Sequence, residues 1–147
     1  MSCVKNMRQW RLVLLILPVV MFLAPPFASG ADGGQESELP YKVIEGKTGA
    51  ATFDGYRRFH KVCHICHGED GMGTPYAPAL VDSLKEMDYD SFAVIVASGL
   101  SQPNRNIMPA FGENTEIFPH LSNIYAYLRA RADGVLAPGR PSRLIPE

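Results

Sequence analysis

Two cysteines and a histidine near the middle of the chain have the spacing of a covalent cofactor site. Cys63 and Cys66 are three residues apart, and His67 follows at once. On a helix these side chains share one face, because positions i, i+3 and i+4 are neighbours. Two thiols so placed can form thioether bonds to the vinyl groups of one porphyrin, whose iron the adjacent imidazole then binds. The motif predicts one covalent haem c, attached through Cys63 and Cys66, with His67 as an iron ligand.

Two other interpretations use the same residues. A Cys-x-x-Cys pair can be a thiol redox centre, but such a centre belongs to a strand-helix-strand context and gives His67 no role. A structural zinc site would need a fourth ligand at suitable spacing. The remaining cysteine, Cys3, lies in a segment that we expect to be removed, and none of the other histidines is spaced like a ligand partner: His60, His64 and His120.

A methionine is the expected ligand on the other face of the haem. Its neutral thioether raises the iron potential into the range that is useful for electron transfer. Met72 follows the motif so closely that it would have to turn back around the ring, and Met87 lies in an acidic segment. Met108 lies in a loop that Pro109 makes rigid, so we predict Met108 as the ligand. The alternative is an iron that is five-coordinate or bound by a second histidine, His60 or His120.

The N-terminus has the features of an export signal. Three basic residues and no acid precede an apolar run at 12–23, which is shorter than the roughly 20 residues of a membrane-spanning helix. Small residues at 28–31 allow cleavage after Gly30 or Ala31. We therefore predict a signal peptide at residues 1–31 and a periplasmic mature protein. An uncleaved N-terminal membrane anchor is the alternative.

The charge balance restricts the partners. The predicted leader holds three of the 14 basic residues and none of the 15 acidic ones, which leaves 11 against 15 and a formal charge of −4. An acidic chain is a poor ligand for nucleic acid, so we exclude nucleic acid as a partner. The mature chain also lacks a lysine cluster, and we expect a monomer.

The rest of the sequence divides into three parts. Residues 32–50 form a flexible or extended lead-in, residues 51–134 form the haem domain, and residues 135–147 form an extended tail. Within the domain, a first helix is predicted from Thr52 or Asp54 to the haem motif. Two further helices are predicted at 88–99, with an Asp at its start and a Gly at its end, and at 119–132.

The first predicted helix resembles that of class I cytochromes c. Gly55, Phe59 and Cys63 fall on one helical face, as a glycine and an aromatic do before the haem cysteines of that family. The resemblance implies an all-α cytochrome c fold, in which the N- and C-terminal helices cross around one covalently bound haem. It also implies that Tyr127 and Leu128 of the last helix pack against Gly55 and Phe59.

The same resemblance implies roles for three more residues. The carbonyl of Pro78 would accept a hydrogen bond from the free ring N–H of His67, and Leu80 would pack on the haem. A metal-bound histidine generally has such an acceptor, although prolines are also common in ordinary turns. The Met108-Pro109 pair is similar to the loop that presents the methionine ligand in this family.

The wider sequence resembles cytochromes of the c-L type. The similarity covers residues 41–143, including the Tyr76–Leu80 run and the Ala130–Gly134 ending of the last helix. It implies a one-electron carrier that is not an enzyme, accepts electrons from a quinoprotein methanol or alcohol dehydrogenase containing pyrroloquinoline quinone, and passes them to another cytochrome or a terminal oxidase. The alternatives are a generic shuttle to an oxidase or, if Met108 is not a ligand, a haem-based sensor.

Overall fold

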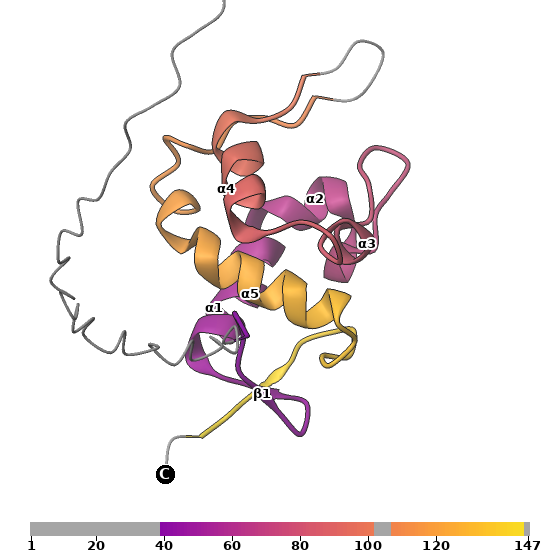
Figure 1. The fold of residues 1–147 in the computed structure, drawn as a ribbon, viewed down its shortest axis with the longest axis vertical. Coiled ribbons are helices and arrows are strands. Elements are labelled where there is room, and N and C mark those ends of the chain that lie inside the picture. The colour runs from indigo at the N-terminus through magenta and orange to yellow at the C-terminus, as the bar shows by residue number, and fades with distance from the viewer. Residues whose placement is uncertain (1–38, 102–106, 146–147) are drawn as a thin grey trace, which may run out of the picture. The chain divides into compact units, whose positions relative to one another are not determined.

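A computed structural model describes residues 39–101 and 107–145 of the chain (Figure 1). The predicted signal peptide lies outside these residues. Within them, no helix is both long and apolar enough to cross a bilayer. The helical elements, including the π-helix η1 and the 3-10 helices η2 and η3, are α1 (Ala50–Arg58), η1 (Phe59–Cys63), α2 (His64–His67), η2 (Glu69–Gly71), α3 (Leu80–Ser83), α4 (Tyr89–Ser98), η3 (Phe118–His120) and α5 (Leu121–Ala132). The strands are β1 (Val43–Ile44), β2 (Lys47–Thr48) and β3 (Ser142–Arg143).

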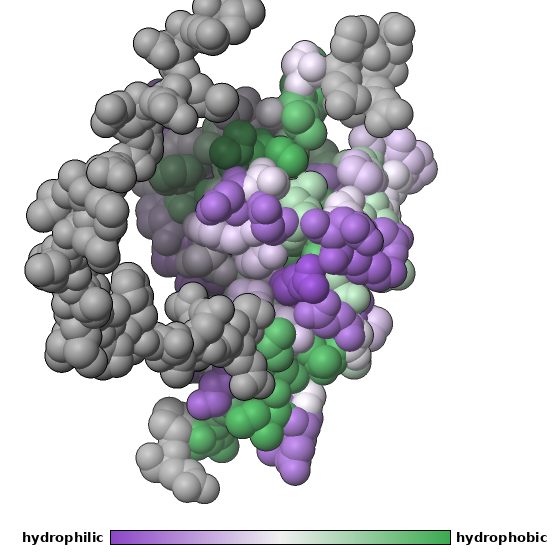
Figure 2. All heavy atoms as spheres, in the orientation of Figure 1, coloured by the Kyte–Doolittle hydropathy of each residue, from purple (hydrophilic) through white to green (hydrophobic). Residues whose placement is uncertain are grey.

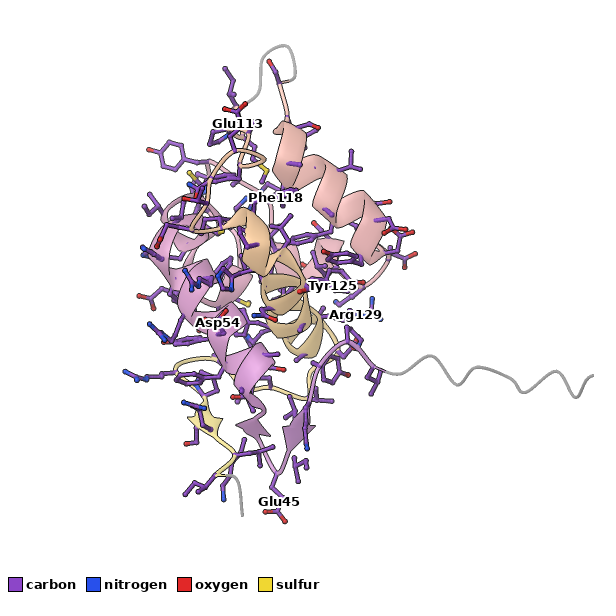
Figure 3. The ribbon with its side chains drawn as sticks, turned by 90° about the vertical axis from the view of Figure 1, so that its left-hand side faces the viewer. Glu45, Asp54, Glu113, Phe118, Tyr125 and Arg129 are labelled. Carbon is purple, nitrogen blue, oxygen red and sulfur yellow. The ribbon has the colours of Figure 1, made fainter. Side chains whose placement is uncertain are left out.

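The elements α1, η1 and α2 follow one another without a break. The helical run begins after Gly49, so the predicted start at Thr52 or Asp54 is wrong. Both side chains bond elsewhere: the Lys42 backbone N–H donates to the Thr52 hydroxyl over 3.2 Å, and Asn123 of α5 donates to the Asp54 carboxylate over 2.9 Å. Figure 3 shows Asp54 beside α5. The run ends after the haem motif at Gly68, whose φ of +74° breaks the helix.

The first and last helices cross in contact, which confirms the predicted cytochrome c fold (Figure 1). A Cβ atom on Gly55 would lie 1.8 Å from the backbone oxygen of Asn123. The glycine therefore makes room for the backbone of α5 at Asn123 and Ile124. As predicted, Tyr127 packs against Phe59, with ring centroids 5.7 Å apart.

The core is formed around this crossing. Phe59 and Tyr127 are both fully buried, and burial of an aromatic side chain of this size stabilises the fold by roughly 2–3 kcal/mol. α4 packs on α5 through Tyr125, whose ring lies 5.5 Å from that of Phe92 and whose hydroxyl donates to the Met87 carbonyl over 3.0 Å (Figure 3). The remaining large apolar side chains with under 2 % exposure belong to the same core: Leu84, Ile117, Ile124 and Leu128.

A small sheet joins the two ends of the described chain and adds strands to the mainly helical fold. β1 pairs antiparallel with β2 through a turn at Glu45 and Gly46, both with positive φ, and Glu45 lies at the tip of this hairpin in Figure 3. β3 pairs with β2 in parallel. Exposed apolar side chains, including Ile44 and Ile145, gather at this end, where Figure 2 shows green areas; the middle of the same face is mostly polar.

Candidate haem site

The two motif cysteines lie where one helical run changes its winding. Cys63 ends the π-helix η1 and Cys66 lies in α2, and both are free thiols. Burial raises the pKa of the Cys63 thiol to about 11. A catalytic redox thiol needs a lowered pKa, so this environment does not fit a thiol redox centre, whereas it fits a thiol that is consumed in a thioether bond. Among the described residues, no group of three or more His, Cys, Asp or Glu side chains could hold a metal ion.

His67 is buried at the end of α2 with one ring nitrogen held. His67 is 8 % exposed, and its Nδ1 lies 3.0 Å from the carbonyl oxygen of Pro78. Since a carbonyl only accepts, Nδ1 carries the proton and donates, which leaves the lone pair on Nε2. An imidazole held in this way is oriented for iron ligation through Nε2. The residues present therefore fit a covalent haem at Cys63, Cys66 and His67.

The loop after His67 satisfies the carbonyl groups that the helix leaves open at its end. Gly68 N–H donates to His64 O over 2.9 Å, and Gly73 N–H donates to His67 O over 2.7 Å. The Thr74 hydroxyl donates to Cys66 O. Because the last four carbonyls of a helix lack helical partners, these bonds fix both the helix end and His67 on it.

Met108 lies in a loop that is tied to α4. It forms an isolated antiparallel bridge with Leu100, with backbone bonds of 2.9 and 3.0 Å. Beyond Pro109, the Phe111 N–H donates to the Val96 carbonyl near the end of α4 over 2.9 Å. As predicted, α4 begins after Asp88, which accepts a hydrogen bond from the Ser91 N–H over 2.8 Å, and ends before glycine. Met108 itself is partly buried against the core.

The other candidate ligands make different contacts. The Met72 sulfur lies 3.9 Å from a guanidinium nitrogen of Arg131. His60 has one ring nitrogen 2.9 Å from the Tyr56 carbonyl, and His120 has one 2.9 Å from the Asp54 carboxylate. Leu80, predicted to pack on the haem, begins α3 and is partly buried against the core.

Sequence reasoning did not single out Asp70. This residue is buried in the loop after His67 and accepts a hydrogen bond from the Tyr127 hydroxyl over 3.0 Å. An acid between glycines has the sequence signature of an exposed turn, and its partner is 57 residues away. No local pattern in the sequence could have found this contact.

A fold in which terminal helices cross beside a Cys-x-x-Cys-His site defines a c-type cytochrome. Residues 50–128 match the family described as cytochrome c oxidase, cbb3-type, subunit III. The chain belongs to this family of cytochrome c domains, and haem c is attached through Cys63 and Cys66.

Individual relatives agree with this assignment. The chain is 42 % identical over 134 residues to cytochrome c-553I of Paracoccus denitrificans, and the match covers 88 % of this chain and 59 % of that one. It is 33 % identical over 90 residues to cytochrome c-555 of Methylococcus capsulatus, covering 60 % and 69 %. The crystal structure of the c-type cytochrome XoxG from Methylobacterium extorquens AM1 is similar with a TM-score of 0.62 and 48 % identity, covering 67 % of this chain and 60 % of that one.

Two conclusions follow from these relatives. The chain spans about three fifths of the length of the Paracoccus and Methylobacterium proteins. The chain contains a cytochrome c domain, and the matches are consistent with a class I cytochrome of the c-L type.

Proposed function

We propose that the protein is a periplasmic carrier of single electrons whose iron is bound by His67 and Met108. When bound, haem c supplies the iron(III)/iron(II) couple. The observation that supports the first ligand is the 3.0 Å contact between His67 Nδ1 and the Pro78 carbonyl, which leaves the Nε2 lone pair free to bind iron.

The arrangement of the loop supports Met108 as the second ligand. Its backbone is bonded to Leu100 on one side and, through the residues that follow, to the end of α4 on the other. The Met72 sulfur contacts Arg131, whereas Met108 is partly buried against the core in the loop that follows α4. A neutral thioether ligand raises the reduction potential, as an electron acceptor from a dehydrogenase requires.

The ligand assignment is tested by replacing each methionine. Met108→Leu should abolish the methionine-to-iron charge-transfer band and lower the reduction potential, because the thioether is lost. Met87→Leu is the matched control, since Met87 is also a partly buried methionine outside a helix and should keep both properties. A charge-transfer band that survives in Met108→Leu would exclude this ligand and assign the band to another methionine, whereas a parent protein without the band would favour the haem-sensor alternative.

We further propose that the donor is a methanol or alcohol dehydrogenase containing pyrroloquinoline quinone, and that the acceptor is another cytochrome or a terminal oxidase. The resemblance to the c-L type supports this donor. Two successive single-electron transfers would oxidise one reduced quinone. Stopped-flow mixing of the ferric protein with such a dehydrogenase and its alcohol should reduce the haem, and the ferrous protein mixed with an oxidase provides the comparison. Rapid oxidation by the oxidase without reduction by the dehydrogenase would identify a generic shuttle.

Export is tested on the full chain. We expect the haem protein in the periplasmic fraction, with an N-terminus produced by cleavage after Gly30 or Ala31. Mass spectrometry of the purified protein distinguishes this result from an uncleaved anchor.

A further inference from the structure

Asp70 is a buried carboxylate in the loop that follows the haem motif. The residue is 7 % exposed and has a left-handed backbone, with φ of +58° and ψ of +15°. This conformation is unfavourable for a residue with a Cβ atom. Burial of a carboxylate is also costly unless hydrogen bonds compensate it. Both features indicate that the contacts of this side chain hold the residue in place.

The polar contacts of Asp70 come from two distant segments. The Tyr127 hydroxyl of α5 donates to Oδ1 over 3.0 Å, and the Gly139 N–H of the tail donates to Oδ2 over 2.8 Å. Burial, followed by the charge and hydrogen bond of Asp70, raises the pKa of Tyr127 far above its usual value, so the phenol stays a neutral donor. Both partners donate, so the two carboxylate oxygens each accept one hydrogen bond.

The surroundings offset this charge only in part. Among the described residues, the group that can form an ion pair within 4.0 Å of the Asp70 carboxylate is the His60 ring, whose Nε2 lies 3.9 Å from Oδ1. Arg131 is near enough to act on Tyr127, but one of its guanidinium nitrogens is bonded to the Leu136 carbonyl. Among the residues that the structure describes, no Lys or Arg forms an ion pair within 4.0 Å of this buried carboxylate.

We propose that Asp70 is a positioning residue for the haem loop and that its charge lowers the reduction potential of the haem iron. Its two hydrogen bonds join the loop to α5 and to the tail, and the Gly73 N–H folds the same loop back onto the His67 carbonyl over 2.7 Å. The inference rests on haem attachment at Cys63 and Cys66. It does not depend on Met108 or on the identity of the donor.

The sign of the effect follows from charge. Ferric iron carries one more positive charge than ferrous iron, so a nearby buried anion favours the ferric state. Asp70 is three residues from His67, which limits the separation of their Cα atoms to roughly 11 Å. At an effective dielectric constant of about 20, a unit charge at such range changes the ferric-to-ferrous equilibrium on the order of tenfold.

Asp70→Asn tests the charge, because asparagine has almost the same shape but no charge. We expect the equilibrium constant for reduction to rise on the order of tenfold, which corresponds to about 59 mV for a one-electron couple. The methionine-to-iron band, where the parent protein shows it, should remain, which separates this result from a failure of the proposed ligation. An unchanged or lowered potential would overturn the proposal.

Tyr127→Phe is the matched variant, because it removes the donor and keeps both the carboxylate and the ring packed on Phe59. Both variants should lower the urea midpoint, as any structural role predicts. Their potentials should move in opposite directions: loss of the hydroxyl leaves the carboxylate less offset and lowers the potential. If Asp70→Asn is not recovered with haem, Tyr127→Phe decides alone, and an unchanged or raised potential contradicts the inference.

Discussion

The segments that carry the two proposed iron ligands are held in different ways. His67 ends a continuous helical run. The backbone of α5 crosses this run so closely at Gly55 that a residue with a Cβ atom does not fit there. Met108 lies in a loop attached by backbone hydrogen bonds to Leu100 and, through its neighbours, to the end of α4. The first ligand thus depends on the main helix crossing of the fold, and the second depends on a local attachment.

This difference predicts different responses to damage. Disruption of the α1–α5 crossing removes core burial from the whole domain, so it should act on folding as a unit. Disruption of the Met108 loop breaks a few local bonds, and regions with few buried contacts open at lower free energy than the core. Changes to the loop should therefore alter the iron environment while the domain stays folded.

Gly55→Val should have the largest effect. The new Cβ would lie 1.8 Å from the Asn123 carbonyl oxygen, and backbone cannot move aside as a flexible side chain can. We expect at least about 3 kcal/mol of destabilisation, or failure to recover haem protein, because overpacking typically costs 1–3 kcal/mol where partial relaxation is available. The measurement is the yield of haem protein together with its urea midpoint.

Ala51→Val is the control for Gly55→Val. Ala51 is exposed on the same helix, so valine there carries the same β-branched helix penalty without the clash. Equal losses in the two variants would show that the helix crossing does not control stability.

Gly99→Ala should affect the Met108 side alone. Gly99 has φ of +71°, and its Cβ would lie 2.5 Å from the Met108 carbonyl and 2.8 Å from the Ala110 N–H. We expect the loop to shift, with a weakened methionine-to-iron band, a lower potential and a stability loss of about 1–3 kcal/mol. Visible spectroscopy at a urea concentration that leaves the domain folded measures this effect.

Gly134→Ala separates backbone strain from the clash. Its φ of +74° is similar to that of Gly99, but nothing lies within 4 Å of the new Cβ. It should lose some stability and keep its spectrum. If both variants keep the parent spectrum, then the approach of Gly99 to Met108 does not position the loop.

The sequence was most informative where a signal is local. The motif at Cys63, Cys66 and His67 carries its own spacing, and the 88–99 helix has an aspartate cap at one end and a glycine at the other, so both could be predicted. Gly55 indicated a close crossing correctly. Its pattern could not tell whether a side chain or a backbone would fill the gap, since either requires the same small residue.

The errors and omissions concern contacts between distant segments. Thr52 and Asp54 are common capping residues, but tertiary hydrogen bonds use both side chains, and the helix begins before them. Strands of two residues have no alternation to detect, so the sheet was not predicted. Asp70 was missed for the same physical reason, because its donors lie on α5 and in the tail.

Asp54→Asn should have the smallest effect on the free energy of unfolding. Its pH dependence tests how charge contributes to the α1–α5 crossing. Burial acts to raise the pKa of Asp54, but the Asn123 hydrogen bond and the charges of Arg58 and His120 outweigh it and hold the pKa below its ordinary value of 3.8. A carboxyl with a lowered folded pKa stabilises the fold above its unfolded pKa, and this contribution is lost as the pH falls through the folded value. The free energy of unfolding of the parent should therefore exceed that of the variant by at most about 1 kcal/mol at pH 7, and the difference should begin to fall near pH 3.8 and vanish below the lower folded pKa. Asp82→Asn, which removes an exposed partner of Lys85 within one helical turn, is the control and should change the urea midpoint little at either pH. A difference between parent and Asp54→Asn that stays constant down to the lowest pH would mean that Asp54 joins α1 to α5 by shape and not by charge.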